Sequence, residues 1–183
     1  MKKIKKFGNL SLKIQNLSKE DIEEAELFQK FLNNLIEEDL QIRINETKTL
    51  KEEKDWIKKE VKKIKERKKV QLVVKDVEEE VIIAMTEIKL LKGKKNHVGE
   101  FGISVVREYR NRGIGSFLTG KIVELAKKEL KLKTIKLSVY KTNKPAIHVY
   151  KKAGFKKVAE VPNQFYWKDK YINEVIMLKT LED

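Results

Sequence analysis

The stretch Arg110-Asn111-Arg112-Gly113-Ile114-Gly115 sets two glycines at a turn between a strand-like run and a helix-like run. Residues 98–106 have the apolar pattern of a β-strand, whereas the apolar residues after the turn recur at helical spacing. A strand that turns through glycines into a helix leaves backbone N–H groups unpaired at the positive end of the helix dipole. The sequence therefore predicts a site for a phosphate-bearing ligand at this turn.

The spacing of the turn excludes two common phosphate-binding loops. No Gly-Lys-Ser/Thr follows the glycines, so the turn is not a nucleoside-triphosphate loop of the Walker type, and its spacing differs from the dinucleotide pattern G-x-G-x-x-G. A helix entry that merely needs flexible residues has the same appearance. The turn alone therefore does not identify the ligand.

Alternation and helical periodicity around the turn predict seven strands and four helices. The predicted strands cover residues 10–14, 70–77, 81–91, 98–106, 135–139, 155–161 and 171–179. Capping residues Ser18, Thr49 and Asn143 mark three helix starts, and the fourth helix follows the glycine turn. The order is β-α-α-β-β-β-α-β-α-β-β. Because a helix connects residues 98–106 to residues 135–139, we expect those two strands to be parallel and the others mainly antiparallel. The fold class is a mixed α/β sheet with helices on both faces.

Composition limits the kinds of site that the chain can hold. Its 183 residues are 40% hydrophobic, which predicts one domain over residues 1–183, with residues 1–8 as a flexible basic leader. The chain has no cysteine and two histidines, so we expect no disulfide, no thiolate nucleophile and no metal site. No apolar run approaches the ~20 residues of a membrane span, and a cytoplasmic location without membrane contact is expected.

The chain is strongly basic, with a net charge of +14. This charge suits a polyanionic ligand, either a phosphorylated cofactor or a nucleic acid, and it disfavours free polycations as substrates. The basic residues 58–69 alternate with glutamates, which is typical of a solvated helix face. Because no aromatic platform lies beside them, nucleic acid is the less favoured partner.

A second motif identifies the ligand through a family resemblance. Residues 143–155, NKPAIHVYKKAGF, follow the pattern N-x-x-A-x-x-x-Y-x-x-x-G-F, and Arg110, Gly113 and Gly115 follow Gln/Arg-x-x-Gly-x-Gly/Ala. Both patterns are signatures of the GCN5-related N-acetyltransferase (GNAT) superfamily, which the chain resembles over nearly its whole length. The ending at residues 171–177 is similar to the ribosomal-protein and phosphinothricin-type branches. The resemblance implies the acyl-CoA N-acyltransferase fold, with a sheet of about seven strands.

The resemblance also implies an enzyme that transfers the acetyl group of acetyl-CoA to a primary amine, by direct attack in a ternary complex and without a metal. The expected acceptor is a protein or peptide amine, at the N-terminus or on a lysine. Two alternatives remain open: a small-molecule amine as acceptor, and a basic CoA-binding or nucleic-acid-associated module without catalysis.

The resemblance assigns cofactor-binding residues to three segments. Backbone amides at the turn would hold the pyrophosphate, the strand edge would pair with the pantetheine arm, and two residues on one face of a later helix would complete the site. These residues are Arg110, Asn111, Arg112, Gly113, Ile114, Gly115 and Ser116 at the turn, Ile103, Ser104 and Val105 on the strand, and Asn143 and Tyr150 on the helix. Asn143 also suits a plain helix N-cap, and Tyr150 a half-buried aromatic.

The same resemblance assigns the chemistry. Tyr150 is the expected general acid for the departing thiolate, and the N–H of Val105 the expected donor to the developing oxyanion. Glu100 is the expected base, although it also suits a surface position at a strand end; Glu87 and Glu174 are weaker candidates. His148 is interpreted as structural.

The acceptor side is less well defined by the sequence. In the family, acceptor specificity lies in the first two helices and in the connection between the last two strands, which correspond here to residues 20–68 and 161–170. Three adjacent aromatic residues, Phe165, Tyr166 and Trp167, occupy the second region, which we expect to be a loop. They suit an acceptor pocket, a contact within a homodimer, or a strand end that packs on the core.

Overall fold

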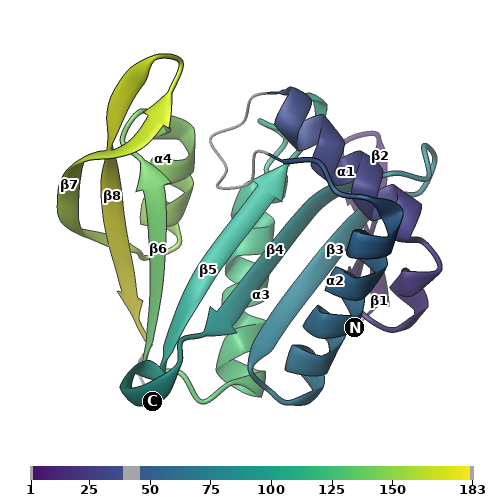
Figure 1. The fold of residues 1–183 in the computed structure, drawn as a ribbon, viewed down its shortest axis with the longest axis horizontal. Helices are drawn as coiled ribbons and strands as arrows, with labels where there is room; N and C mark the ends of the chain where they lie inside the picture. Colours follow the sequence, from purple (N-terminus) through teal and green to yellow (C-terminus); the bar gives the residue numbers. More distant parts are fainter. Residues whose placement is uncertain (1, 39–45, 182–183) are drawn as a thin grey trace.

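The computed structural model describes residues 2–38 and 46–181, whose strands form one sheet in the order β1-β2-β3-β4-β5-β6-β8-β7 (Figure 1). The strands are β1 Lys2–Phe7, β2 Leu10–Asn16, β3 Lys69–Asp76, β4 Ile82–Leu90, β5 Val98–Val105, β6 Thr134–Tyr140, β7 Lys156–Trp167 and β8 Lys170–Thr180. The helices are α1 Ala25–Glu37, α2 Leu50–Lys65, α3 Ile114–Glu129 and α4 Lys144–Lys152. Short 3-10 turns lie at Glu20–Ile22, Gly93–Lys95 and Arg107–Tyr109.

The helices cover the two faces of the sheet in pairs. Figure 1 shows α1 and α2 in front of β3 and β4, with α3 and α4 behind the sheet. Two hydrophobic clusters fill the layers: one joins Leu118 and Ile122 of α3 to the sheet, and the other joins Phe28 of α1 and Ile57 of α2 to the opposite face. The strands β5 and β6 are parallel and every other neighbouring pair is antiparallel. The predicted mixed sheet with helices on both faces is confirmed.

Of the helix starts predicted at Thr49 and Ser18, the first is confirmed and the second lies several residues later than expected. Thr49 and Glu52 form the predicted reciprocal capping box at the start of α2. The Asp21 carboxylate accepts a hydrogen bond from the Ser18 N–H at 2.8 Å, but this contact begins a 3-10 turn, and α1 starts only at Ala25. Within the described residues, no helix combines the length and apolar character that a bilayer span requires.

The segment expected to be a flexible basic leader is instead a strand over residues 2–7. It pairs with β2 from Lys2↔Gln15 to Phe7↔Leu10, and Gly8 makes the connecting turn at φ +62°. The Phe7 ring contacts the Phe117 ring of α3 edge-on, with centroids 5.5 Å apart. The four lysines of this strand gave the segment the composition of a solvated leader. The contacts that stabilise it come from β2 and α3. The sheet therefore has eight strands rather than seven.

Residues 161–170, which were expected to form a loop, are instead mostly strand. Strand β7 continues to Trp167, and β8 begins at Lys170, so the two strands form a long hairpin with a two-residue turn. Lys168 and Asp169 have φ values of +50° and +57°, as tight hairpin turns require. Since neither residue is glycine, the turn chemistry gave no signal in the sequence.

Candidate active site

The strands β5 and β6 separate after a short parallel contact. Their register contains only Val98↔Thr134, Gly99↔Ile135 and Glu100↔Lys136. Beyond that point β5 stays paired with β4, and β6 with β8, so the two strands diverge (Figure 1). Among the described residues, the divergence leaves one edge of β5 without a neighbouring strand over residues 101–105.

Alternation along β5 decides which backbone groups face that edge. The N–H of Val106 donates to the carbonyl of Ile83 on β4 at 2.9 Å. In an antiparallel ladder the backbone groups of successive residues point to opposite sides. Those of Ser104 therefore face β4, whereas those of Ile103 and Val105 face the divergence. An extended ligand arm would pair with these two residues as an added strand does.

The glycine turn places the N-terminus of α3 beside this edge. Gly113 is the N-cap of α3 and has φ +78°, a left-handed conformation that glycine adopts without strain. The first N–H groups of a helix lack intrahelical acceptors, and they attract anions. A Cβ placed on Gly113 or Gly115 would meet no atom within 4 Å, so open space lies in front of this backbone.

The Arg110 side chain is held by acceptors of the protein itself. Its Nε donates to the carbonyl of Val105 at 2.9 Å, and its Nη2 lies 2.5 Å from a carboxylate oxygen of Glu38. Glu38 also accepts a hydrogen bond from the Arg107 N–H at 3.0 Å. Arg110 therefore ties the end of β5 to the C-terminal end of α1. The positive charge of this guanidinium is therefore already neutralised by a carboxylate.

On the other wall of the divergence, α4 carries the predicted Asn143 and Tyr150. The Asn143 carboxamide oxygen accepts a hydrogen bond from the Ala146 N–H at 3.2 Å, so this residue does cap α4. Tyr150 is buried, and its ring packs edge-on against Phe101 and Phe155 at 5.5 and 6.2 Å. Burial raises the pKa of Tyr150 to about 12, so the phenol keeps its proton across the physiological range.

These three segments enclose a groove of about 640 Å³, called the splay groove below. Every predicted cofactor-binding residue lines it except Arg112 and Ile114. Those that do are Ile103, Ser104, Val105, Arg110, Asn111, Gly113, Gly115, Ser116, Asn143 and Tyr150. Arg112 is exposed outside the groove, and the Ile114 side chain is buried in the core, which leaves only its backbone near the helix start.

Glu100 lies outside the splay groove. Alternate residues of a strand point to opposite faces, so Glu100 and Ser104 share the face of α1 and α2, while Phe101 packs toward α3. Glu100 forms an ion pair with Lys89 at 3.4 Å. The structure therefore does not bring Glu100 and Tyr150 to one wall. Of the two weaker candidates, Glu87 pairs with buried Lys69 and Glu174 with the hydroxyl of Ser138.

Six residues of the splay groove were not singled out in the sequence. They are Arg107, Thr119, Pro145, Ala146, His148 and Val149. His148 was interpreted as structural, but it is exposed at the rim of the groove. It lies five residues after Asn143, a rotation of about 140° around the helix, so helical spacing did not indicate that it would line the groove.

Comparison with protein families gives one match that covers most of the chain. The sequence model of the acetyltransferase (GNAT) family matches residues 30–155. This range contains the edge of β5, the glycine turn and the whole of α4.

Two curated relatives match shorter segments. An L-amino acid N-acetyltransferase of Escherichia coli (strain K12) is 32% identical over 93 residues, which are 51% of this chain and 57% of the relative. An N-alpha-acetyltransferase of Sulfurisphaera tokodaii is 40% identical over 65 residues, 36% of this chain and 38% of the relative. The chain thus spans about half the length of the curated relatives it matches.

A solved structure matches over the entire length. The ribosomal-protein-S5-alanine acetyltransferase from Vibrio fischeri aligns with a TM-score of 0.85 and 17% identity, covering 100% of this chain and 98% of that chain. At this identity the likeness shows that the two chains share a fold.

Proposed function

Because this chain belongs to the acetyltransferase (GNAT) family, we propose that it transfers the acetyl group of acetyl-CoA to a primary amine while both substrates are bound. The observation that carries the proposal is the splay groove, where an unpaired strand edge, a helix N-terminus, Asn143 and Tyr150 surround one space. Each of these parts suits a different portion of the same cofactor.

Acetyl-CoA supplies an activated thioester, and the backbone would hold it. The N–H groups of Gly113 to Ser116 lie at the N-terminus of α3, beside the open space at Gly113 and Gly115, and would hold the pyrophosphate. The backbone groups of Ile103 suit the amides of the pantetheine arm. Because Glu38 neutralises Arg110, we expect backbone N–H groups and the helix dipole to contribute most to binding of the phosphates.

Two groups then act on the thioester. The Val105 N–H points into the divergence and would donate a hydrogen bond to the carbonyl oxygen as negative charge develops there. Tyr150 would donate to the departing sulfur. With a pKa of about 12, this phenol is a weaker acid than a thiol by roughly 3.5 units. Its contribution is therefore a hydrogen bond that stabilises the negative charge on the departing sulfur, and the thiolate takes up the proton that the amine releases.

The amine must lose a proton before it attacks. We propose Glu100 as the base, acting through water, because its carboxylate lies on the opposite face of the sheet from Tyr150 and outside the groove. Replacing Glu100 by Gln tests this role: activity should fall most at low pH, where the amine is cationic. Unchanged pH profiles would instead indicate proton release to bulk water.

The acceptor that we propose is the N-terminal amine of a protein or peptide. A free amino acid is the second candidate, favoured by the 93-residue match to an L-amino acid N-acetyltransferase. A direct test is calorimetric binding of acetyl-CoA, followed by thiol release with peptides and with amino acids. Absence of acetyl-CoA binding at millimolar concentration would overturn the proposed function.

A further inference from the structure

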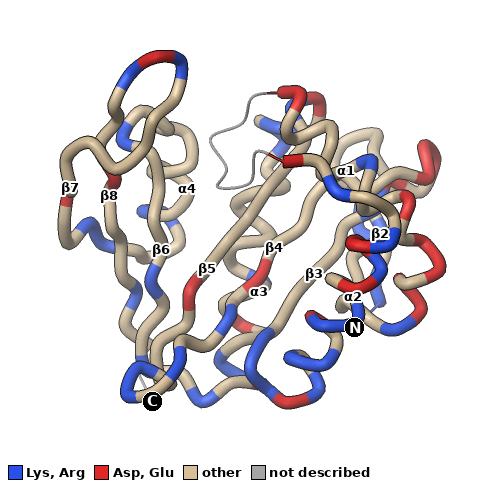
Figure 2. The backbone as a smooth tube through the Cα atoms, in the orientation of Figure 1, with Lys and Arg blue, Asp and Glu red and all other residues tan. Residues whose placement is uncertain are grey.

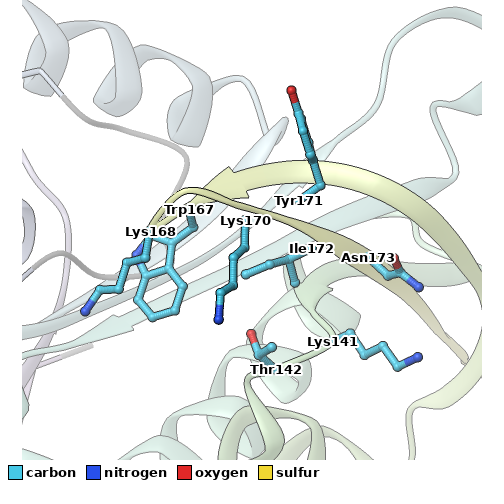
Figure 3. A pocket seen from close by; sticks show the side chains of 8 residues that line it. All are labelled: Lys141, Thr142, Trp167, Lys168, Lys170, Tyr171, Ile172 and Asn173. Carbon is cyan, nitrogen blue, oxygen red and sulfur yellow. The ribbon is translucent and has the colours of Figure 1, made fainter.

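A second pocket, of about 510 Å³, lies at the tip of the β7–β8 hairpin and is called the hairpin pocket. Figure 3 shows Trp167, Lys170 and Ile172 on the side of the hairpin that faces Thr142 and Lys141. Tyr171 points away from them in the same view. The pocket therefore combines an apolar floor, made by an indole and an isoleucine, with a rim of ammonium groups.

The charges at this rim are mainly positive. Figure 2 shows the hairpin tip as two basic segments with one acidic segment between them, which are Lys168, Asp169 and Lys170. Asp169 accepts a hydrogen bond from the Tyr166 hydroxyl at 3.0 Å. The Lys168 ammonium lies 4.6 Å from the centroid of the Trp167 ring.

Three lysines line the hairpin pocket: Lys141, Lys168 and Lys170. Lys141 and Lys170 differ in whether a carboxylate neutralises their charge. Lys141 forms an ion pair with Glu160 at 2.5 Å, and that carboxylate also binds Lys157. Within residues 2–38 and 46–181, Lys170 forms no ion pair with any carboxylate. Lys170 is therefore a cation of this pocket that can bind an added anion without breaking an existing ion pair.

The hairpin pocket adjoins the splay groove. Thr142 lines the pocket and the next residue, Asn143, lines the groove, so the turn from β6 to α4 separates the two spaces. Beside this turn, the Tyr140 ring stacks on Phe165 with centroids 3.8 Å apart. A ligand group in the pocket thus lies across one turn of chain from the groove that would hold the thioester.

Given this adjacency, and on the basis of the proposed function, we propose that the hairpin pocket binds a carboxylate carried by the acceptor, with Lys170 as its ion-pair partner. The preferred acceptor is then an amine with a carboxylate a few bonds away, either the α-carboxylate of a free amino acid or an acidic side chain near a peptide N-terminus. A polyamine is disfavoured, because its second ammonium would face lysines.

The experiment measures kcat/KM by thiol release for L-alanine, L-alaninamide and the peptide amide Ala-Glu-Ala-NH2. The first and third acceptors carry a carboxylate, and the second does not. We expect the carboxylate acceptors to exceed L-alaninamide by about fivefold, the effect of roughly 1 kcal/mol for a solvent-exposed ion pair. The preference should shrink as salt increases. Preference for L-alanine alone indicates a free amino acid, and preference for the peptide indicates an acidic N-terminus.

Variants connect this preference to one side chain. Lys170→Gln should abolish the preference by lowering kcat/KM for the carboxylate acceptors toward that for L-alaninamide, whereas Lys170→Arg should keep it. The matched control is Lys156→Gln, which removes an exposed lysine at the other end of the hairpin. Equal kcat/KM for L-alanine, Ala-Glu-Ala-NH2 and L-alaninamide in the wild type would overturn the proposal, as would an equal loss for all three in Lys170→Gln.

A binding measurement separates this proposal from the proposed function. Trp167 lines the pocket, so titration with N-acetyl-L-alanine should change its fluorescence in a saturable way. The Trp167→Phe variant identifies the signal, and Lys170→Gln should remove it. Saturable binding supports the carboxylate site even if no acceptor is acetylated. A titration without any change, in a protein that acetylates L-alaninamide, overturns the carboxylate site and leaves the proposed function intact.

Discussion

The splay groove and the hairpin pocket lie on either side of the turn from β6 to α4, but they are made from different groups. The groove presents mainly backbone: the edge of β5, the helix start at Gly113 and the open space at Gly115. The pocket presents side chains, chiefly Trp167, Lys170 and Ile172. Backbone groups suit a cofactor that many sequences share, whereas side chains can change with the acceptor without disturbing the sheet.

The largest expected effect is on kcat, and it distinguishes the catalytic role of Tyr150 from a role in binding acetyl-CoA. Tyr150→Phe should lower kcat by roughly 10²- to 10⁴-fold, since it removes the proton donor to the leaving sulfur. The dissociation constant for acetyl-CoA should stay nearly unchanged, because the ring still packs on Phe101 and Phe155. The rate of thiol release measures kcat, and calorimetry measures the dissociation constant for acetyl-CoA. The control is Tyr166→Phe, at an exposed tyrosine of the hairpin. If Tyr150→Phe lowers kcat by less than threefold, Tyr150 takes no part in the chemical step.

The next effect tests whether the backbone binds the phosphates. Gly115→Leu should weaken acetyl-CoA binding by about tenfold or more, because the new side chain fills the space in front of the helix N-terminus. Stability should be unchanged or higher, since a helical glycine is unfavourable by about 1 kcal/mol. Gly120→Ala is the matched control in the same helix, also in open space, and should raise stability without changing affinity. Equal affinities for both variants would contradict a phosphate site at the turn.

A third prediction concerns the ion pair that joins the groove to α1. Arg110→Met should lower the free energy of unfolding by about 1–3 kcal/mol, because Glu38 loses a charge-assisted partner. The double variant with Glu38→Gln should cost less than the sum of the two single changes. Denaturant unfolding of all four proteins measures this coupling. Additive changes would mean that the contact contributes nothing to stability.

The smallest effect lies beside the hairpin pocket. Hydrogen bonds from Lys141, Lys157 and Asn173 lower the pKa of Glu160 from its ordinary 4.5 to about 2. Because the folded-state pKa is depressed, the stability from this carboxylate is present above pH 4.5 and is lost as the pH falls toward 2. Melting temperatures of the wild type and Glu160→Gln should therefore converge over that interval. Parallel curves would show that Glu160 does not stabilise the hairpin.

Local patterns in the sequence were sufficient to predict much of the fold and most of the residues that line the groove. The glycine turn, the Asn143–Tyr150 spacing and the strand-helix-strand unit each depend on contacts between near neighbours in the chain. The family match over residues 30–155 confirms the resemblance that these motifs indicated. The chemical roles assigned to Tyr150, Val105 and Glu100 stay predictions.

The failures have two physical causes. Strand β1 is stabilised by Phe117, more than a hundred positions away, and its lysines gave it the appearance of a solvated leader. The hairpin tip turns through Lys168 and Asp169, whose positive φ values depend on the pairing of the flanking strands. A local pattern does not report the first contact, which is distant, and the second turn lacks the glycine that usually marks such a turn.

The chain's own local chemistry was enough to specify a phosphate-binding turn, because glycine conformations and helix N-termini depend on adjacent residues. The long-range packing paired the Arg110 guanidinium with Glu38 and placed Glu100 on the opposite face of the sheet from Tyr150. It also assembled the hairpin pocket from residues 141–142 and 167–173. These features depend on where distant segments meet, which the packing of the whole sheet decides.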